Sequence, residues 1–288
     1  MDPIMNSKTV SIILIACIYL MASSLGFGVY LVLPFAFWAN LLIADVAATV
    51  FVFIFSVIFR NASVYDPYWS VQPLVIVLCY AAFHKLTWAT FLVIIPIVLW
   101  SIRLTGNWAY TFGGLMAQDW RYTKYEKETG RLYPLINFAG IHMMPTLIVY
   151  LCTMPAVFIV RSETTANAGS VIGAAICICA VTLQLFADAQ MQKYRKSGSH
   201  GLIRTGLWKY SRHPNYLGEI LMWWGVGIQA VSVMPEFWWL LAGALANTVM
   251  FFTVSIPLAD KRQSKKPGYA EYKAGTRNLL PIPKKQGA

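Results

Sequence analysis

The stretch VSIILIACIYLMASSLGFGVYLVLP, residues 10–34, is apolar almost throughout and decides the class of fold. A helix needs about 20 apolar residues to cross the hydrocarbon core of a bilayer. The hydrophobic part of a secretory signal has only about 7–15 residues, and this stretch continues past its small residues. It therefore predicts a first membrane-spanning helix rather than a cleavable signal.

The composition extends this prediction to the whole chain. Of the 288 residues, 58% are hydrophobic and 12% are charged, whereas about 25% are charged in a typical soluble domain. We therefore expect an all-α fold, a polytopic integral membrane helix bundle with seven to eight transmembrane helices. The candidate spans are residues 10–33, 38–59, 68–84, 87–108, 134–160, 170–192, 214–232 and 236–258. The third and the seventh are short, so one of them is expected to be tilted or incomplete.

The 23 Lys and Arg residues are distributed unevenly between the segments that join these stretches. With eight helices, all except Lys85 and Arg161 fall on one side of the membrane. Cytoplasmic loops are enriched in basic residues, which predicts a multi-pass membrane protein with both termini in the cytoplasm. This orientation, together with contacts to anionic lipid headgroups, accounts for most of the net charge of +11. Nucleic-acid binding is not expected, because the sequence has no basic soluble domain to carry it.

The cysteines and histidines predict neither a metal site nor a disulfide framework. All five cysteines lie inside apolar stretches and are interpreted as small buried hydrophobic residues. No CxxC motif or Cys/His cluster is present. His84, His142 and His200 are scattered along the chain and are interpreted as structural or interfacial.

Several polar residues lie within or beside the predicted spans, where each is a functional hypothesis by default. Asp45, Thr49 and Ser56 share one face of the second span and are expected to form interhelical hydrogen bonds. Asp66 lies between Tyr65 and Tyr68, next to a predicted helix start. One interpretation is a helix cap. The alternative is a carboxylic acid whose pKa is raised by an apolar setting and which, together with a neighbouring phenol, hydrogen-bonds a substrate carbonyl.

Further polar residues gather in segments that are predicted to be cytoplasmic. They follow the sixth span, they include the motif SRHPNYLGE (211–219), and they continue after the eighth span in PGYAEYKAGTRNLLP (267–281). Arginines suit phosphate, carboxylates and amides suit ribose and base, and aromatic rings allow stacking. These segments predict a site for a phosphorylated or nucleoside-like cofactor that opens toward a lipid-facing cavity. There is no GxGxxG or P-loop motif, so a standard dinucleotide fold is not expected.

The motif HPNYLGE (213–219), with GLWKYSR before it and PGYAEYKAGTRNLLP after it, resembles the C-terminal half of the steroid 5-alpha-reductase-like membrane proteins. More narrowly, the chain is similar to the DUF1295 group, on the segments NASVYDPYWS (61–70), RLTGNW (103–108) and DWRY (119–122). This resemblance implies an additional transmembrane helix over residues 1–36. It also implies a steroid-reductase-like transmembrane domain over residues 37–288, with cytoplasmic cofactor-binding loops and a basic tail.

The resemblance also implies roles for individual positions. Asn215 and Glu219 match residues around the nicotinamide and the substrate, and Asp66 falls where the steroid reductases have a catalytic glutamate. Trp100 occupies the position of their catalytic tyrosine, so that role would pass to Tyr65, Tyr68 or another phenol. The candidate catalytic residues are Asp66, Tyr65, Tyr68 and Glu219. The candidate cofactor-binding residues are Arg103, Asn107, Gln184, Asp188, Arg195, Arg204, Tyr210, Arg212, His213, Asn215, Tyr216, Arg262, Tyr272 and Arg277.

These observations predict an NADPH-dependent oxidoreductase that acts on an activated C=C bond of a lipophilic substrate from the bilayer. Sterol-like, polyprenoid-like and enoyl-lipid-like molecules all fit that description. An alternative stays open, because isoprenylcysteine and phospholipid methyltransferases carry a related RHPxY element and use S-adenosylmethionine. A third possibility is a membrane sensor or scaffold in which the motif serves only packing.

Overall fold

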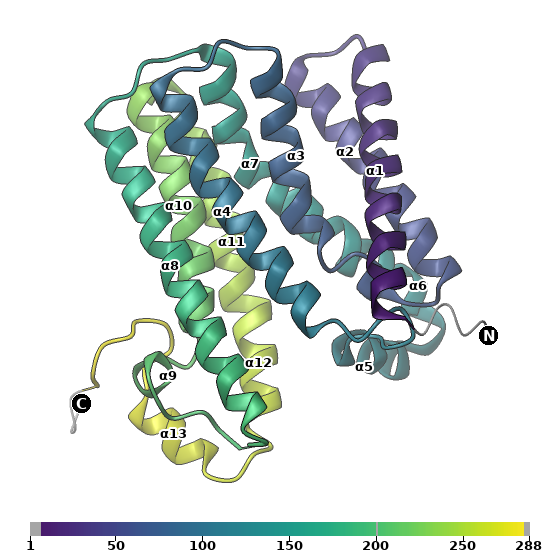
Figure 1. Ribbon diagram of the computed structural model, residues 1–288, viewed down its shortest axis with the longest axis vertical. Helices are drawn as coiled ribbons and strands as arrows, with labels where there is room; N and C mark the ends of the chain where they lie inside the picture. The colour runs from purple at the N-terminus through teal and green to yellow at the C-terminus, as the bar shows by residue number, and fades with distance from the viewer. Residues whose placement is uncertain (1–6, 200, 285–288) are drawn as a thin grey trace. The chain divides into compact units, whose positions relative to one another are not determined.

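The computed structural model describes residues 7–199 and 201–284, so His200 lies outside the described residues. The described residues form helices and connecting segments, with no β-strand among them. This agrees with the all-helical fold that the sequence predicts. Figure 1 shows the helices and their labels.

The chain divides into two compact units. The first unit contains Met1–Phe83 and Trp100–Met154, and the second contains His84–Leu99 and Pro155–Ala288. Two long helices, α4 (Trp88–Thr111) and α7 (Met144–Ser162), are divided between the units, so that one end of each belongs to the first unit and the other end to the second. The first two helices, Lys8–Val32 and Phe37–Ile58, both belong to the first unit.

The first unit has three further long helices and several short ones. Its elements besides the ends of α4 and α7 are α1 (Lys8–Val32), α2 (Phe37–Ile58), a 3₁₀ turn (Ala62–Val64), α3 (Tyr68–Ala82), α5 (Trp120–Thr129), a 3₁₀ turn (Gly130–Leu132), α6 (Tyr133–Leu135) and a π-helical segment (Ile136–Met143). Gly26 brings α1 close to α2, because a Cβ there would lie 3.2 Å from the carbonyl oxygen of Ala44. Their shared core continues to Tyr65 and Tyr68, which follow α2 in the chain.

The second unit contains the helices that carry the motif residues. Its elements besides the ends of α4 and α7 are α8 (Ala168–Lys196), α9 (Leu207–Tyr210), α10 (Pro214–Val233), a 3₁₀ segment (Pro235–Leu241), α11 (Ala242–Met250), a π-helical segment (Phe251–Ser255), α12 (Ile256–Gln263) and α13 (Tyr269–Gly275). Asn167 starts α8 with a capping box that includes Ser170. Pro214 lies at the first position of α10, where its fixed φ suits a helix start.

Helices α8 and α10 run side by side, and glycines allow their backbones to approach closely (Figure 1). A Cβ at Gly225 would lie 2.5 Å from Sγ of Cys177 and 2.7 Å from the carbonyl oxygen of Gly173. Small residues at helix interfaces are the usual means of close packing in membranes, where the hydrophobic effect does not favour helix association. This contact holds the middle of α10 closely against the first part of α8.

Six of the described helical segments are long and apolar enough to cross a membrane, which indicates a multi-pass membrane protein. They are α1, α2, α4, Trp120–Ser162, α8 and Pro235–Gln263. The predicted count of seven to eight is therefore matched only in part. The two differences are α3, which has only 15 residues, and α10, which has 20 residues but carries Asn215, Glu219 and Gln229. They are the same third and seventh stretches that are short in the sequence.

Candidate functional site

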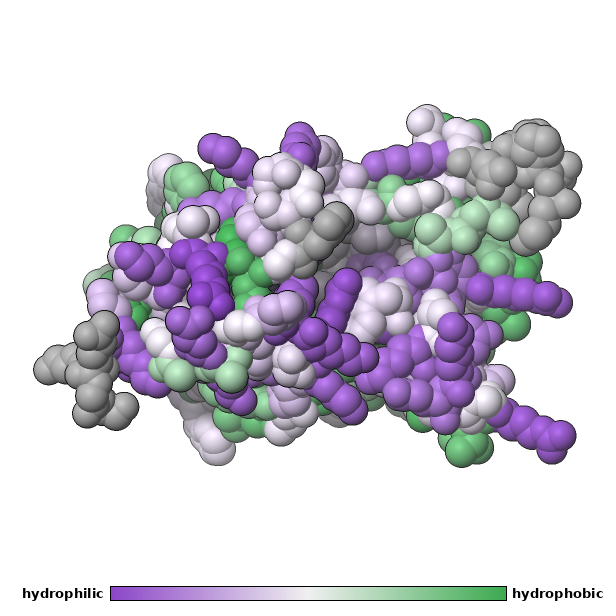
Figure 2. All heavy atoms as spheres, turned by 90° about the horizontal axis from the view of Figure 1, so that it is seen from below, coloured by the Kyte–Doolittle hydropathy of each residue, from purple (hydrophilic) through white to green (hydrophobic). Residues whose placement is uncertain are grey.

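The second unit contains a cavity of about 280 Å³. It lies among the end of α8, the loop after it, α9, the start of α10, α12 and α13. The left part of Figure 2 looks onto this end of the second unit, where hydrophilic side chains dominate the surface. The described residues that line the cavity are Met191, Tyr194, Arg195, Ser199, Gly201, Ile203, Trp208, Arg212, His213, Asp260, Arg262, Gln263, Lys266, Tyr269 and Tyr272.

Trp208 fixes the wall of this cavity by joining three helices. Its indole Nε1 donates to the carbonyl oxygen of Ala187 on α8 at 3.1 Å. Its own carbonyl oxygen accepts a hydrogen bond from the hydroxyl of Tyr272 on α13 at 2.6 Å. Burial raises the pKa of Tyr272 to about 12, so the phenol keeps its proton at neutral pH and remains a donor. Helix α9 is therefore tied to both α8 and α13.

Asp260 of α12 joins the two residues that precede α10. Its Oδ1 lies 3.0 Å from Nε2 of His213, and its Oδ2 accepts from Arg212 at 3.2 Å. Arg212 also donates to the carbonyl oxygen of Thr276 at 3.0 Å, while its buried Nε has no protein partner among the described residues. The backbone N–H of Arg212 donates to the carbonyl oxygen of Arg277 at 2.9 Å. These bonds connect the start of α10 to α12 and to the C-terminal segment.

Three cations approach one another in the remaining part of the lining. The pKa of Lys266 is lowered by burial and, next, by repulsion from Arg262 and Arg195. Its ammonium group donates to the carbonyl oxygen of Gly201 at 2.8 Å, which holds the side chain in the cavity wall. A cluster of mutually repelling cations stores unfavourable electrostatic energy that an anion would relieve. This part of the cavity therefore suits phosphate or carboxylate groups.

The same cavity contains aromatic surfaces that suit a base or a nucleoside. Tyr194, Trp208, Tyr269 and Tyr272 contribute rings to the lining. Burial raises the pKa of Tyr269, so its phenol also stays neutral. A nucleotide needs both kinds of group, because its phosphates bind cations and its base stacks on aromatic rings.

The predicted cofactor-binding residues divide into those that line the cavity and those that do not. Arg195, Arg212, His213, Arg262 and Tyr272 line it. The residues of the second unit that lie outside the described lining are Gln184, Asp188, Arg204, Tyr210, Asn215, Tyr216 and Arg277. Arg204 instead pairs with Glu271 at 3.2 Å, and Tyr216 stacks on the ring of His213 with the centroids 5.2 Å apart.

Trp208, Asp260 and Lys266 are cavity residues to which the sequence assigns no role in the site. Trp208 and Asp260 lie in or next to segments that the sequence already marks, GLWKYSR and the basic region after the eighth span. The sequence feature that could have identified Lys266 is its position directly before the PGYAEY segment. The lining residues come from two separate stretches of chain, residues 191–213 and 260–272, and no local pattern predicts that these stretches meet.

Glu219 lies deeper in the second unit, between α8 and α10, and is buried. Its Oε2 accepts from the side-chain amide of Gln184 at 2.6 Å, and its Oε1 accepts from Nε1 of Trp223 at 3.2 Å. The amide of Gln184 also lies 3.5 Å from the backbone carbonyl oxygen of Asn215. Three of the predicted site residues thus meet in one group. The buried Oε1 of Gln184 has no protein partner among the described residues.

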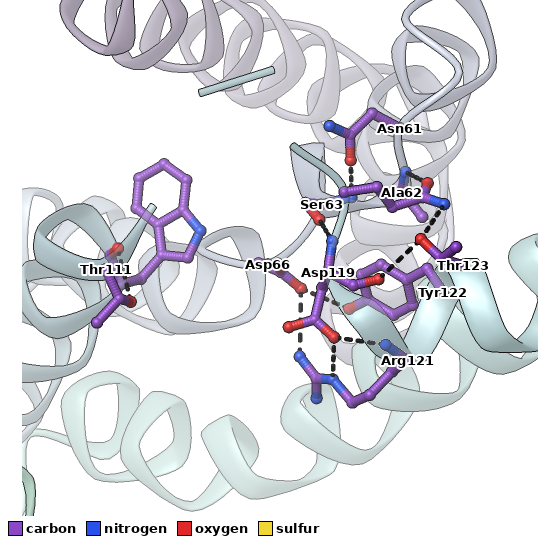
Figure 3. A network of polar contacts seen from close by, with 11 residues as sticks. Asn61, Ala62, Ser63, Asp66, Thr111, Asp119, Arg121, Tyr122 and Thr123 are labelled. Carbon is purple, nitrogen blue, oxygen red and sulfur yellow. Dashed lines mark hydrogen bonds and ion pairs between the residues drawn. The ribbon is translucent and has the colours of Figure 1, made fainter. Parts of the chain in front are cut away.

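Asp66 belongs to the first unit and forms a separate polar cluster with the start of α5 (Figure 3). Its carboxylate accepts a hydrogen bond from the hydroxyl of Tyr122, and Arg121 lies 3.8 Å from the same oxygen. Arg121 also pairs with Asp119 at 2.8 Å, and Asp119 caps α5. Burial, opposed by Arg121 and by Tyr122, raises the pKa of Asp66 to about 6. The carboxyl group therefore keeps its proton to a higher pH than an exposed aspartate does.

The phenol that contacts Asp66 is thus Tyr122, which lies in the segment DWRY but is not among the predicted catalytic residues. Tyr65 instead shares a hydrogen bond of 2.8 Å with Thr146, and Tyr68 donates to Asp45 at 3.5 Å. The predicted residues Arg103 and Asn107 lie on α4 and also belong to the first unit.

The chain is similar to two proteins of yeasts over parts of its length. An uncharacterised protein of Schizosaccharomyces pombe is 29% identical over 150 residues, which are 43% of this chain and 43% of that protein. A protein-S-isoprenylcysteine O-methyltransferase of Saccharomyces cerevisiae is 42% identical over 43 residues, 15% of this chain and 17% of that protein. The chain therefore spans less than half the length of these relatives. No solved structure matches the chain.

The profile of the family described as "protein of unknown function (DUF1295)" matches residues 52–276. The matched region begins within α2, ends just after α13 and includes both the Asp66 cluster and all the lining of the cavity in the second unit. Since the match covers more than half of the chain, this protein belongs to the DUF1295 family.

Proposed function

We propose that this protein is a membrane-embedded, NADPH-dependent reductase of an activated C=C bond in a lipophilic substrate. The charge of the cavity in the second unit is the observation that supports this function best. Arg195, Arg212, Arg262 and Lys266 line it together with a single carboxylate, Asp260, among the described residues. Such an excess of cations favours a ligand that carries several negative charges.

NADPH fits this chemistry because it combines three phosphates with an adenine base. The volume of about 280 Å³ is at the lower end of ligand pockets. The cavity therefore suits the adenosine and phosphate end of the cofactor rather than the whole molecule. In this proposal Arg195, Arg262 and Lys266 bind phosphate, and the ring of Trp208 supports the base. Asp260 holds Arg212 and His213 in position.

When bound, NADPH supplies the hydride for the reduction. We propose that Asn215 and Glu219 position its nicotinamide end, as the resemblance to the steroid reductases implies. Within the first unit, the Asp66–Tyr122 pair is by itself a hydrogen-bond donor of the kind that stabilises a carbonyl or enolate oxygen. A carboxyl group with a raised pKa is suited to this role, because its protonated form persists closer to neutral pH. The substrate is proposed to enter from the bilayer as a sterol-like, polyprenoid-like or enoyl-lipid-like molecule.

The test is a comparison of ligands on the purified full chain in detergent or nanodiscs. NADPH is expected to bind with micromolar affinity, to raise the melting temperature, and to bind more tightly than NADH and S-adenosylmethionine. Lys266→Ala should weaken NADPH binding about tenfold or more, since a charged hydrogen bond contributes roughly 1.5–3 kcal/mol.

The matched control is Lys273→Ala, which removes an exposed lysine of α13 that does not line the cavity. Its affinity for NADPH should equal that of the wild type. A wild-type protein that binds no NADPH, or a Lys266→Ala variant that binds it normally, contradicts the proposed cofactor site.

One observation favours a second candidate function, that of an S-adenosylmethionine-dependent methyltransferase. The observation is the 42% identity over 43 residues with the yeast isoprenylcysteine methyltransferase. S-adenosylmethionine carries a sulfonium cation and no phosphate, so the cationic cavity suits it less well than NADPH. Tighter binding of S-adenosylmethionine than of NADPH in the same assay would assign this second function.

A further inference from the structure

The segment that follows α13 in the second unit exposes two large apolar side chains. Leu280 is 53% exposed and Ile282 is 49% exposed. Exposed apolar side chains on a membrane-spanning helix contact lipid, but these two residues lie outside the candidate spans found among the described helices. Apolar surface that stays in water is unfavourable, so a neighbouring pair of this kind indicates an interaction surface.

A hydrogen-bonded turn presents these two side chains. The backbone N–H of Ile282 donates to the carbonyl oxygen of Leu280 at 2.9 Å, which closes a three-residue turn around Pro281. The ring of Pro281 fixes its own φ and so favours one backbone conformation. We call residues 279–284 the C-terminal turn.

Two basic side chains close the base of the C-terminal turn. Nε of Arg277 donates to the carbonyl oxygen of Pro283 at 3.4 Å. The ammonium group of Lys284 donates to the carbonyl oxygen of Ala274 at 2.7 Å. The turn is therefore bonded back to the end of α13, and its apolar side chains point away from the rest of the protein.

Backbone hydrogen bonds also attach the turn to the segment that opens α10. The N–H of Arg212 donates to the carbonyl oxygen of Arg277 at 2.9 Å, and the N–H of His213 donates to that of Asn278 at 3.2 Å. In the other direction, the N–H of Arg277 donates to the carbonyl oxygen of Tyr210 at 3.2 Å. The turn therefore begins beside the first residue of α10. In Figure 1 it is part of the yellow segment near α9.

Contacts with α8 place this segment at the edge of the membrane. Trp208, just before the paired segment, donates to the carbonyl oxygen of Ala187 at 3.1 Å. Leu185 and Phe186 of α8 are exposed and apolar, as lipid-facing residues are, whereas the basic end of α8 includes Lys193. Ala187 and Lys193 are separated by about 9 Å along the helix, at roughly 1.5 Å per residue. The C-terminal turn is thus attached where α8 passes from lipid tails to headgroups.

The charge around the C-terminal turn is positive. Lys273, Arg277 and Lys284 are its basic neighbours, and the sequence has no acidic residue from Tyr272 to Lys284. Apolar side chains flanked by Lys and Arg are typical of segments that lie in the interface of a membrane with anionic lipids. Lys and Arg can also reach headgroups while their aliphatic stems remain on apolar surface.

We propose that the C-terminal turn is an interfacial anchor that inserts Leu280 and Ile282 among the headgroups of a leaflet containing anionic lipid. Lys273, Arg277 and Lys284 bind the negative charge of those headgroups. Since the turn is hydrogen-bonded to residues 210–213, the anchor also holds the start of α10 at the membrane surface. This proposal involves neither NADPH nor the proposed reaction, and its test requires no activity.

The experiment measures the depth of the turn in the full-length protein in nanodiscs. Ile282→Cys in a cysteine-free background carries a nitroxide spin label. Electron paramagnetic resonance then compares its accessibility to oxygen, which concentrates in the bilayer, with that to a nickel chelate, which stays in water. The oxygen-to-nickel ratio should exceed that of a water-exposed site about threefold or more, because anchored side chains lie roughly 5–10 Å into the headgroup and acyl boundary. Adding phosphatidylglycerol to phosphatidylcholine nanodiscs should raise the ratio, and salt should reverse this rise.

The water-exposed reference is Lys265→Cys, in the connection between α12 and α13, which is exposed and does not line the cavity. Its ratio should be low in both kinds of nanodisc. A label at Leu280→Cys should repeat the result while Ile282 is kept, and it serves if the first variant does not fold. Leu280→Ser combined with labelled Ile282→Cys should lower the ratio.

Three results would overturn the anchor. The first is a ratio at both labelled positions equal to that at Lys265→Cys. The second is a ratio that does not change when phosphatidylglycerol is added. The third is low accessibility to both reagents, which would mean that another copy of the chain, rather than lipid, covers Leu280 and Ile282.

Discussion

The side-chain amide of Gln184 donates to Oε2 of Glu219 across 2.6 Å, and this bond joins α8 to α10 in the interior of the second unit. The two residues are 35 positions apart in the sequence. Trp223 donates to the other carboxylate oxygen at 3.2 Å, so Glu219 accepts from two neighbours at once.

Glu219→Ala is expected to lower the free energy of unfolding by about 2–4 kcal/mol, because two buried donors lose their acceptor. Glu219→Gln should cost less. The unpartnered Oε1 of Gln184 can accept from the new amide once the Gln184 amide rotates. Chemical denaturation in detergent measures both values. Equal losses for the two variants would show that charge rather than hydrogen bonding is what Glu219 contributes.

Gly225→Ala is expected to destabilise the second unit by about 1–3 kcal/mol, since overpacking forces helices apart. The added Cβ would lie 2.5 Å from Sγ of Cys177 and 2.7 Å from the carbonyl oxygen of Gly173. Thermal unfolding in detergent measures the loss.

The control for this prediction is Gly28→Ala on α1, where a new Cβ meets no atom within 4 Å. This change should leave stability unchanged or raise it by about 0.5–1 kcal/mol, because alanine is the better helix former. If Gly225→Ala behaves like Gly28→Ala, then α8 and α10 are not packed as closely as described.

Asp66 predicts a pH dependence with a defined sign. Burial raises its pKa to about 6 from the usual 3.8 of an aspartate, so the folded protein favours the protonated acid. The stabilisation from this group is therefore complete below about pH 4 and is lost as the pH rises through about 6. Relative to Asp66→Asn, the wild type should lose about 2–3 kcal/mol of unfolding free energy between these pH values. Parallel curves for the two proteins would mean that Asp66 is ionised throughout this range.

The predicted orientation can be tested on the two ends of α8. In a cysteine-free background, Ser197→Cys follows α8 and Thr165→Cys precedes it, and both positions are exposed. If the basic side is cytoplasmic, a membrane-impermeant maleimide added to intact cells should label Thr165→Cys and spare Ser197→Cys. Labelling of Ser197→Cys instead would reverse the assignment of both termini.

The sequence by itself determined the helices, because apolar length is a local property. It predicts a helix over 170–192, which lies within α8 at Ala168–Lys196, and one over 214–232, where the structure has α10 at Pro214–Val233. Of these two, only α8 is apolar enough to count among the candidate membrane spans. It does not predict α5 (Trp120–Thr129), whose charged residues are typical of a connecting loop. The class of fold could therefore be read without knowing any contact between helices.

Only the tertiary structure decided which side chains meet. The sequence marked Arg195, Arg212 and Arg262 as cations, but their common cavity depends on Trp208 and Asp260, which hold separate segments together. Likewise Asp66 was a candidate acid, yet its phenol partner, Tyr122, lies 56 residues away. Hydrogen bonds and charge pairs act over a few ångströms in space, and sequence distance does not constrain them once the chain has folded. The membrane class therefore follows from composition, whereas the chemistry follows from the packing of the helices.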